Sequence, residues 1–129
     1  MGLKADYLFW PFTLNDMEIL STSPSKRFQV RADVWEARNS LWVYSPSIWD
    51  VELDYHLLSF EDKRWSVDTS SWLSETTVRL SLRKFPGNHR PEQLSVEVDC
   101  LGFTATVPRA ATTPLADLET VLNRALSWV

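Results

Sequence analysis

Two-residue alternation of apolar and polar side chains is the feature that most constrains this fold. From Phe28 to Val34, every even position is apolar, whereas the odd positions Gln29, Arg31 and Asp33 are polar. Successive side chains of a strand point to opposite faces, so this run predicts a strand with one buried face. Four further runs alternate in the same way: residues 49–57, 78–83, 94–99 and 103–107. The pattern predicts an antiparallel sheet with one dry and one wet face.

Turn-forming sequences separate these runs and indicate where the strands end. They contain Ser, Pro, Gly or Asn and lie at residues 23–25, 45–47, 86–88 and 101–102. Gly102 can supply the positive φ that a tight hairpin requires. Shorter candidate strands lie at 7–12, 17–21, 41–44 and 64–67, and the Ser/Thr-rich stretch 68–77 predicts a loop.

The segment 48–60 has two readings. Ser47 and Asp50 have the spacing of a capping box, which would open a helix running to about Phe60. On a helical wheel, however, the apolar residues fall on opposite sides and form no single stripe. The strand pattern fits every position from 49 to 57, so we favour a strand and keep the helix as the alternative.

The C-terminal residues follow a helical pattern instead. Thr113 can cap the helix and Pro114 suits its first position, while Leu115, Leu118 and Leu122 recur at helical spacing. The sequence of 129 residues therefore predicts one α+β domain. Its strand-rich body at 5–110 forms a twisted antiparallel sheet of six to eight strands, on which an amphipathic helix at 113–128 packs.

Charge and cysteine content narrow the classes of partner and compartment. The formal net charge of −4 argues against a nucleic-acid-binding domain. The early apolar cluster at 7–12 is interrupted by Pro11 and is far shorter than a membrane span, so we expect no membrane partner. A single cysteine excludes an internal disulfide and fits a reducing compartment, which predicts a cytoplasmic protein.

Catalytic and cofactor-binding motifs are absent from the sequence. It has two histidines and three glycines, and no nucleophile elbow, phosphate loop or dinucleotide fingerprint. Cys100 has the strand parity of a buried apolar residue, which favours a packing role over a reactive thiol. We therefore predict a protein that is not an enzyme, with no catalytic residue, cofactor or metal site.

Three acids and two tryptophans are the candidate partner-binding residues. In a strand, Asp50, Glu52 and Asp54 would project from one face about 6.5–7 Å apart. That row is either a solvated face balanced by Arg31 or Arg79, or a docking surface for a basic partner. Trp35 has the parity of the polar face, and Trp72 lies in the predicted loop. Each is a candidate interface anchor, with Trp72 alternatively folding back as a lid on the core.

Two oppositely charged segments add to this picture. Residues 49–62 hold five acids and no Lys or Arg, whereas residues 76–91 hold four basic side chains and no acid. The two segments can neutralise each other as neighbouring strands, or their polarity can steer a charged partner.

The order of elements in the C-terminal two-thirds resembles a known group of proteins. A Trp-Ser-Val stretch at 65–67 leads to strands at 77–84, 94–100 and 103–108 and to a closing helix from Pro114. This order is similar to small bacterial domains of unknown function, several of which sit among polymorphic-toxin immunity proteins. The resemblance implies a cytoplasmic, non-enzymatic protein that binds and blocks a cognate toxin. It also implies a helix near residues 49–57.

These observations together predict a small acidic module that binds another protein. An immunity protein that neutralises a basic toxin domain is the specific form that the resemblance implies. The alternative is a β domain that binds a small ligand or a carbohydrate through an exposed tryptophan.

Overall fold

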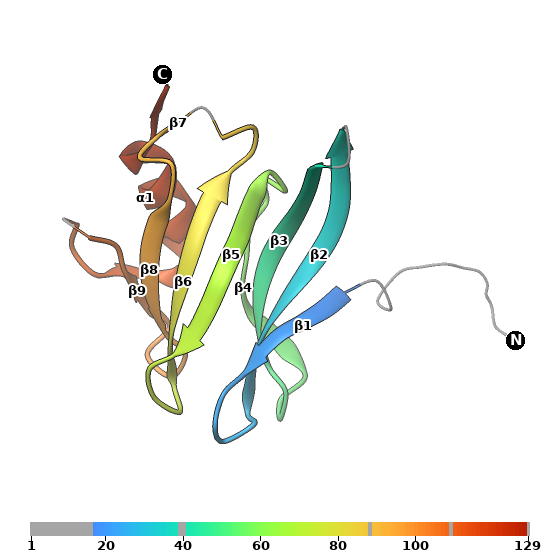
Figure 1. The fold of residues 1–129 in the computed structure, drawn as a ribbon. Helices are drawn as coiled ribbons and strands as arrows, with labels where there is room; N and C mark the ends of the chain where they lie inside the picture. The colour runs from blue at the N-terminus through green and yellow to red at the C-terminus, as the bar shows by residue number, and fades with distance from the viewer. Residues whose placement is uncertain (1–16, 39–40, 88, 109, 129) are drawn as a thin grey trace, which may run out of the picture.

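The computed structural model describes residues 17–38, 41–87, 89–108 and 110–128 (Figure 1). The first sheet has the order β1-β2-β3-β4, and the second has the order β10-β9-β8-β6-β5. The first consists of β1 (Met17–Thr22), β2 (Phe28–Arg38), β3 (Leu41–Asp50) and β4 (Tyr55–Ser59). The second consists of β5 (Trp65–Trp72), β6 (Thr77–Lys84), β8 (Leu94–Asp99), β9 (Thr104–Thr106) and β10 (Thr113–Pro114). The candidate strand at 7–12 lies outside the described residues.

The remaining elements lie at the C-terminal end of the chain and in the connection that follows β6. A short 3₁₀ turn, η2 (Leu115–Asp117), leads into the helix α1 (Leu118–Ala125). After the helix, β11 (Ser127–Trp128) pairs with β7 (His89–Arg90) as a two-stranded ribbon. The fold is thus mostly antiparallel β-structure with one short C-terminal helix, as the sequence pattern predicted at that level.

The prediction of one sheet with six to eight strands was wrong in detail, because the described strands form two principal sheets. β4 pairs with β3 only from Ser47 to Asp50. The N-terminal half of β3 lies beside β5 instead. No backbone ladder links these two strands in the described residues; the backbone N–H of Tyr44 on β3 donates to the side-chain Oγ of Ser66 on β5 at 3.0 Å. Alternation predicts which residues form strands but not which strand edges meet, so this division was not visible in the sequence.

Alternation did predict the buried faces of the central strands. Phe28, Val30 and Ala32 of β2 are buried, and so are the apolar residues of β6 and β8. Those on β6 and β8 are Val78, Leu80, Leu82, Leu94, Val96 and Val98. Apolar residues from both sheets join Leu115, Leu118 and Leu122 in one core cluster. The two sheets and the helical segment therefore share a single core.

The predicted turn at 45–47 is instead the middle of β3. Pro46 lies opposite Ala32 within the β2–β3 ladder. Tyr44 has the same parity as Pro46, and its N–H points away from β2 toward Ser66. The nitrogen of Pro46 therefore also faces away from β2, on the edge of β3 that β4 would occupy. Because β4 pairs with β3 only from Ser47 onward, the absence of an N–H at Pro46 costs no hydrogen bond between strands.

Two loop predictions near the second sheet also need correction. β5 continues through the stretch 68–77 as far as Trp72, with a register shift at Asp68, so only a short connection separates it from β6. In the β8–β9 turn, the positive φ of 55° belongs to Phe103, which is half exposed and not on the buried face. A Cβ at Gly102 would lie 2.7 Å from Asp99 Oδ2, so the Asp99 carboxylate, which accepts the N–H groups of Leu101 and Gly102, would have to shift.

The C-terminal helix is shorter than the predicted 113–128. Thr113 and Pro114 pair with β9 as β10, and the α-helix begins only at Leu118. The N-terminus of α1 has no side-chain cap. The helical spacing of Leu115, Leu118 and Leu122 nevertheless describes the buried side, since all three are buried.

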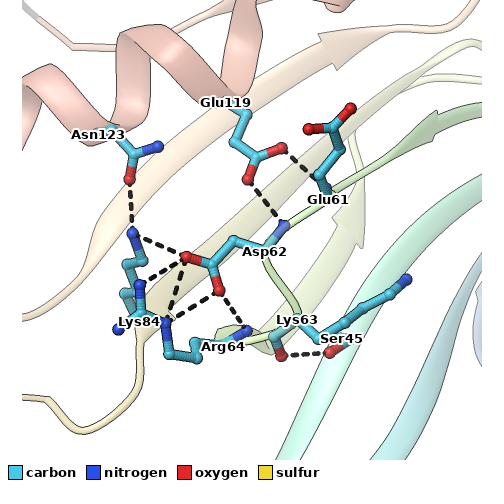
Figure 2. A network of polar contacts seen from close by, with 8 residues as sticks. All are labelled: Ser45, Glu61, Asp62, Lys63, Arg64, Lys84, Glu119 and Asn123. Atoms are coloured by element: carbon cyan, nitrogen blue, oxygen red, sulfur yellow. Dashed lines mark hydrogen bonds and ion pairs between the residues drawn. The ribbon is translucent and has the colours of Figure 1, made fainter.

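A polar network attaches the helix to the connection between β4 and β5 (Figure 2). Arg64 and Lys84 both bind the carboxylate of Asp62, with shortest contacts of 2.8 Å and 3.2 Å. Lys84 Nζ also donates to Asn123 Oδ1 on α1 at 2.8 Å. The bonds from Arg64 and Lys84 hold the pKa of Asp62 well below its usual range, against the opposing effect of its partial burial.

Glu119 makes the second attachment of the helix. Its two carboxylate oxygens accept the backbone N–H groups of Glu61 and Asp62 at 2.9 Å and 3.0 Å (Figure 2). The acidic segment 49–62 and the basic segment 76–91 are therefore joined by the ion pair between Asp62 and Lys84, within the network that holds the helix. The other basic side chains of β6 pair elsewhere: Arg79 with Glu97, and Arg83 with Asp68.

Candidate functional site

The connection between β3 and β4 exposes apolar and acidic side chains together. Residues 51–54 form a turn, which reverses the chain so that Asp50 pairs with Tyr55. We call residues 51–55 the acidic loop. Its Val51, Leu53 and Tyr55 side chains are 39%, 59% and 40% exposed, and they alternate in sequence with Glu52 and Asp54, which are also exposed.

The acidic loop is held in shape by the buried carboxylate of Asp50. Arg27 donates from Nη2 to Asp50 Oδ2 at 3.0 Å, and the backbone N–H of Leu53 donates to Asp50 Oδ1 at 3.2 Å. The N–H of Val51 donates to the carbonyl of Arg27 at 2.7 Å. These bonds fix both the start and the middle of the loop, so its side chains are presented by a braced turn.

The electrostatics of Asp50 follow from this packing. Burial opposes ionisation of the carboxyl group, but the bonds from Arg27 and Leu53 outweigh it and lower the pKa of Asp50. Arg27 also lies 3.7 Å from Glu52, whose side chain is 68% exposed. Glu52 thus forms an ion pair with Arg27 while most of its side chain stays exposed, and Asp54 is exposed as well.

The structure does not place Asp50, Glu52 and Asp54 in a row on one strand face. The strand predicted over 49–57 is interrupted by the turn, and Asp54 takes a positive φ of 57°. Asp50 is 1% exposed and is balanced by Arg27, not by Arg31 or Arg79. Arg31 instead lies over the ring of Trp49, 4.7 Å from its centroid.

The two candidate tryptophans occupy half-buried positions. Trp35 Nε1 donates to Ser45 Oγ and to the carbonyl of Lys63. Trp72 packs against the core and donates from Nε1 to Ser21 Oγ at 3.0 Å, as in the alternative in which it covers the core. Trp72 thus joins β5 to β1 of the other sheet, whereas Trp35 joins β2 to β3 and to the connection that precedes β5.

Residues of β3, of β5 and of the chain at the end of β6 line a groove. Figure 1 shows the strands β3 and β5 that contribute to it. We call it the β3–β5 groove; its volume is about 600 Å³. Its lining includes Leu41, Trp42, Tyr44, Thr69, Arg83 and Phe85. Trp42 is 52% exposed and is the largest exposed side chain among the described residues that line it.

The residues considered for nucleophilic chemistry are not brought together. Burial, together with the negative charges of Asp99 and Asp50, raises the pKa of the Cys100 thiol to about 12. Such a thiol carries almost no thiolate at neutral pH. His56 is exposed and contacts the ring of Trp49 edge-on, with centroids 5.5 Å apart. The side chain of His89 lies outside those that the structure describes.

Within residues 17–38, 41–87, 89–108 and 110–128, no group of three His, Cys, Asp or Glu side chains is placed to hold a metal ion. In the same residues, no helix has the length and apolar character needed to cross a membrane.

Sequence reasoning missed the apolar part of the acidic loop and the exposed Trp42. Alternation assigned Val51, Leu53 and Tyr55 to a buried face, because every second residue of a continuing strand would lie on that face. The residue that could have indicated a turn here is Asp50, since Asp side chains often accept backbone N–H groups in turns.

Comparison with models of known protein families, with curated proteins and with solved structures finds no match for this chain.

Proposed function

We propose that this chain is a non-enzymatic protein-binding module that docks on a basic partner surface through the acidic loop. The observation that supports this function best is the exposure of Val51, Leu53 and Tyr55, which alternate along the loop with the two solvent-facing carboxylates of Glu52 and Asp54. Exposed apolar side chains gathered on one braced loop are typical of binding surfaces, whereas isolated ones are ordinary.

The two kinds of side chain have different roles in the proposed complex. Burial of Leu53 and Tyr55 against the partner supplies most of the affinity, because anchors that enter apolar pockets dominate interface energies. Glu52 and Asp54 attract a positively charged surface from a distance and thereby raise the association rate. The bracing by Asp50 and Arg27 reduces the conformational entropy that the loop loses on binding.

Charge complementarity determines the class of partner. The formal net charge is −4, and Arg27 is the cation that contacts the loop among the described residues. A partner must therefore carry Lys or Arg around an apolar depression. A basic toxin domain, neutralised by this chain as an immunity protein, is the partner class that we propose.

Replacing Leu53 with aspartate tests the role of the loop directly. The full-length protein is used to capture its partner from its native cell, and the purified partner is then titrated by calorimetry. We expect Leu53→Asp to weaken binding by about 100-fold, since a charged group enters the apolar contact. The matched control is Leu41→Asp, at the other end of β3, where the leucine is 48% exposed. We expect the control to bind as tightly as the native protein. Equal weakening by both variants, or by neither, contradicts the proposal.

A further inference from the structure

The β3–β5 groove is a further candidate binding surface, and it is separate from the acidic loop. Its volume of about 600 Å³ lies within the range of about 300–1,000 Å³ usual for small-molecule clefts. The groove is formed by the N-terminal half of β3, whereas the acidic loop follows the C-terminal end of that strand. Occupancy of one site can therefore be tested separately from the other.

Aromatic side chains make up part of the lining of the groove. Trp42 is 52% exposed, and the half-buried Tyr44 and Phe85 line the same space. The face of an aromatic ring is electronegative and attracts the polarised C–H groups on the flat side of a sugar ring. An indole of this exposure is available for such stacking.

Polar side chains that line the groove are fixed by their own hydrogen bonds. Arg83 binds Asp68 through Nε and Nη2 at 3.0–3.1 Å, and Gln93 Nε2 donates to Asp68 Oδ2 at 2.8 Å. A guanidinium carries five N–H donors. Arg83 uses its Nε and Nη2 groups to bind Asp68, so the N–H donors on Nη1 remain available to a ligand. Planar groups held in this way can bind the two neighbouring hydroxyls of a sugar ring, and Thr69 adds another hydroxyl to the lining.

The balance of charge in the groove determines the class of ligand. Asp68 and Arg83 are ion-paired across β5 and β6, and they are the charged side chains that line the groove in the described residues. Their charges cancel, so a charged ligand gains little. A purely apolar ligand would displace water from the Arg83 Nη1 donors and the Thr69 hydroxyl without replacing the hydrogen bonds that water makes there. We propose that the β3–β5 groove binds a neutral saccharide, which stacks on Trp42 and is hydrogen-bonded by the Asp68–Arg83 pair.

Titration calorimetry with the full-length protein tests this proposal. The probes are soluble hexasaccharides of glucose, N-acetylglucosamine, xylose and mannose, each titrated separately. We expect at least one to bind and Trp42→Ala to weaken that binding by at least 10-fold, while Trp42→Tyr retains most of it. Arg83→Met, which keeps an unbranched side chain without the fork, is expected to weaken it by a similar factor.

The outcomes separate this site from the acidic loop. Leu53→Asp is expected to leave saccharide binding unchanged, and Trp42→Ala is expected to leave capture of the protein partner unchanged. Circular dichroism of each variant confirms that it is folded. Absence of binding by all four probes, or binding that does not respond to Trp42→Ala, overturns the proposal. Loss of protein-partner binding in Trp42→Ala, without any saccharide response, would assign the groove to protein docking and would also overturn it.

Discussion

Replacing Trp65 with alanine is expected to lower the free energy of unfolding by about 3–5 kcal/mol, the range for large aromatic residues truncated in a core. Trp65 is fully buried, and its ring packs on Phe60 with centroids 5.8 Å apart. Lys84 Nζ lies 5.5 Å from the indole centroid, so truncation also removes a cation–π contact. Urea denaturation followed by circular dichroism gives the change in free energy.

The variant Trp65→Phe separates the volume of this side chain from its polar atom. Within the described part of the chain, Trp65 Nε1 is a buried donor without a hydrogen-bond partner. Phenylalanine removes that donor, whose desolvation costs about 1–3 kcal/mol, while it leaves a smaller cavity than alanine does. We therefore expect Trp65→Phe to be within about 1 kcal/mol of the native protein. Equal losses in the two variants would show that the indole N–H matters and the ring volume does not.

Replacing Asp50 with alanine is expected to cost about 2–3 kcal/mol. Loss of one partner from a buried ion pair costs about 3–5 kcal/mol, and the smaller figure applies here because the Arg27 side chain is 34% exposed and can be hydrated. The N–H of Leu53 also loses its acceptor. Asp50→Asn is expected to fall between alanine and the native residue, since the amide oxygen can still accept that bond. An alanine variant as stable as the native protein would contradict the bracing role of Asp50.

The pH dependence of the same variant checks the charge on Asp50. Its pKa is lower in the folded protein than in the unfolded chain, so its stabilisation is fully present above the unfolded pKa of about 3.9. This stabilisation is lost as the pH falls below that value toward the folded pKa. The difference in stability between native protein and Asp50→Ala should therefore be constant from pH 7 to pH 5 and should shrink toward pH 3. A difference that grows on acidification would contradict the lowered pKa.

The sequence predicted the strands whose burial follows a local rule. β2, β6 and β8 each bury alternate side chains against one core, and the period of two is written directly into their residues. The buried side of the C-terminal helical segment was predicted for the same reason, since Leu118 and Leu122 are spaced by one helical turn. The conformation of the first residues of the predicted helix, Thr113 and Pro114, was not predicted, because these residues pair with β9 as a short strand.

The candidate site could not be predicted in the same way, because distant contacts create it. The acidic loop turns where Arg27, 23 residues earlier in the chain, binds Asp50, and no local pattern contains that pair. Without the turn, Val51 and Leu53 would continue a half-buried strand. The β3–β5 groove likewise depends on which strand edges come together, and alternation carries no information about that.

The most direct test of the proposed function is the rate at which the captured partner associates with a charge-reversed loop. Each of Glu52→Lys and Asp54→Lys adds two charges, so the double variant changes the formal net charge from −4 to zero. The control Glu18→Lys/Glu92→Lys makes the same change at two other exposed positions. Association rates are measured by stopped flow at low and at high salt. At low salt, we expect the loop variant to associate at least 10-fold more slowly than the native protein, and the control to be slowed much less. At high salt, the rates of the three proteins should differ little. Equal slowing by both double variants, or native rates for the loop variant, would contradict docking through the acidic loop.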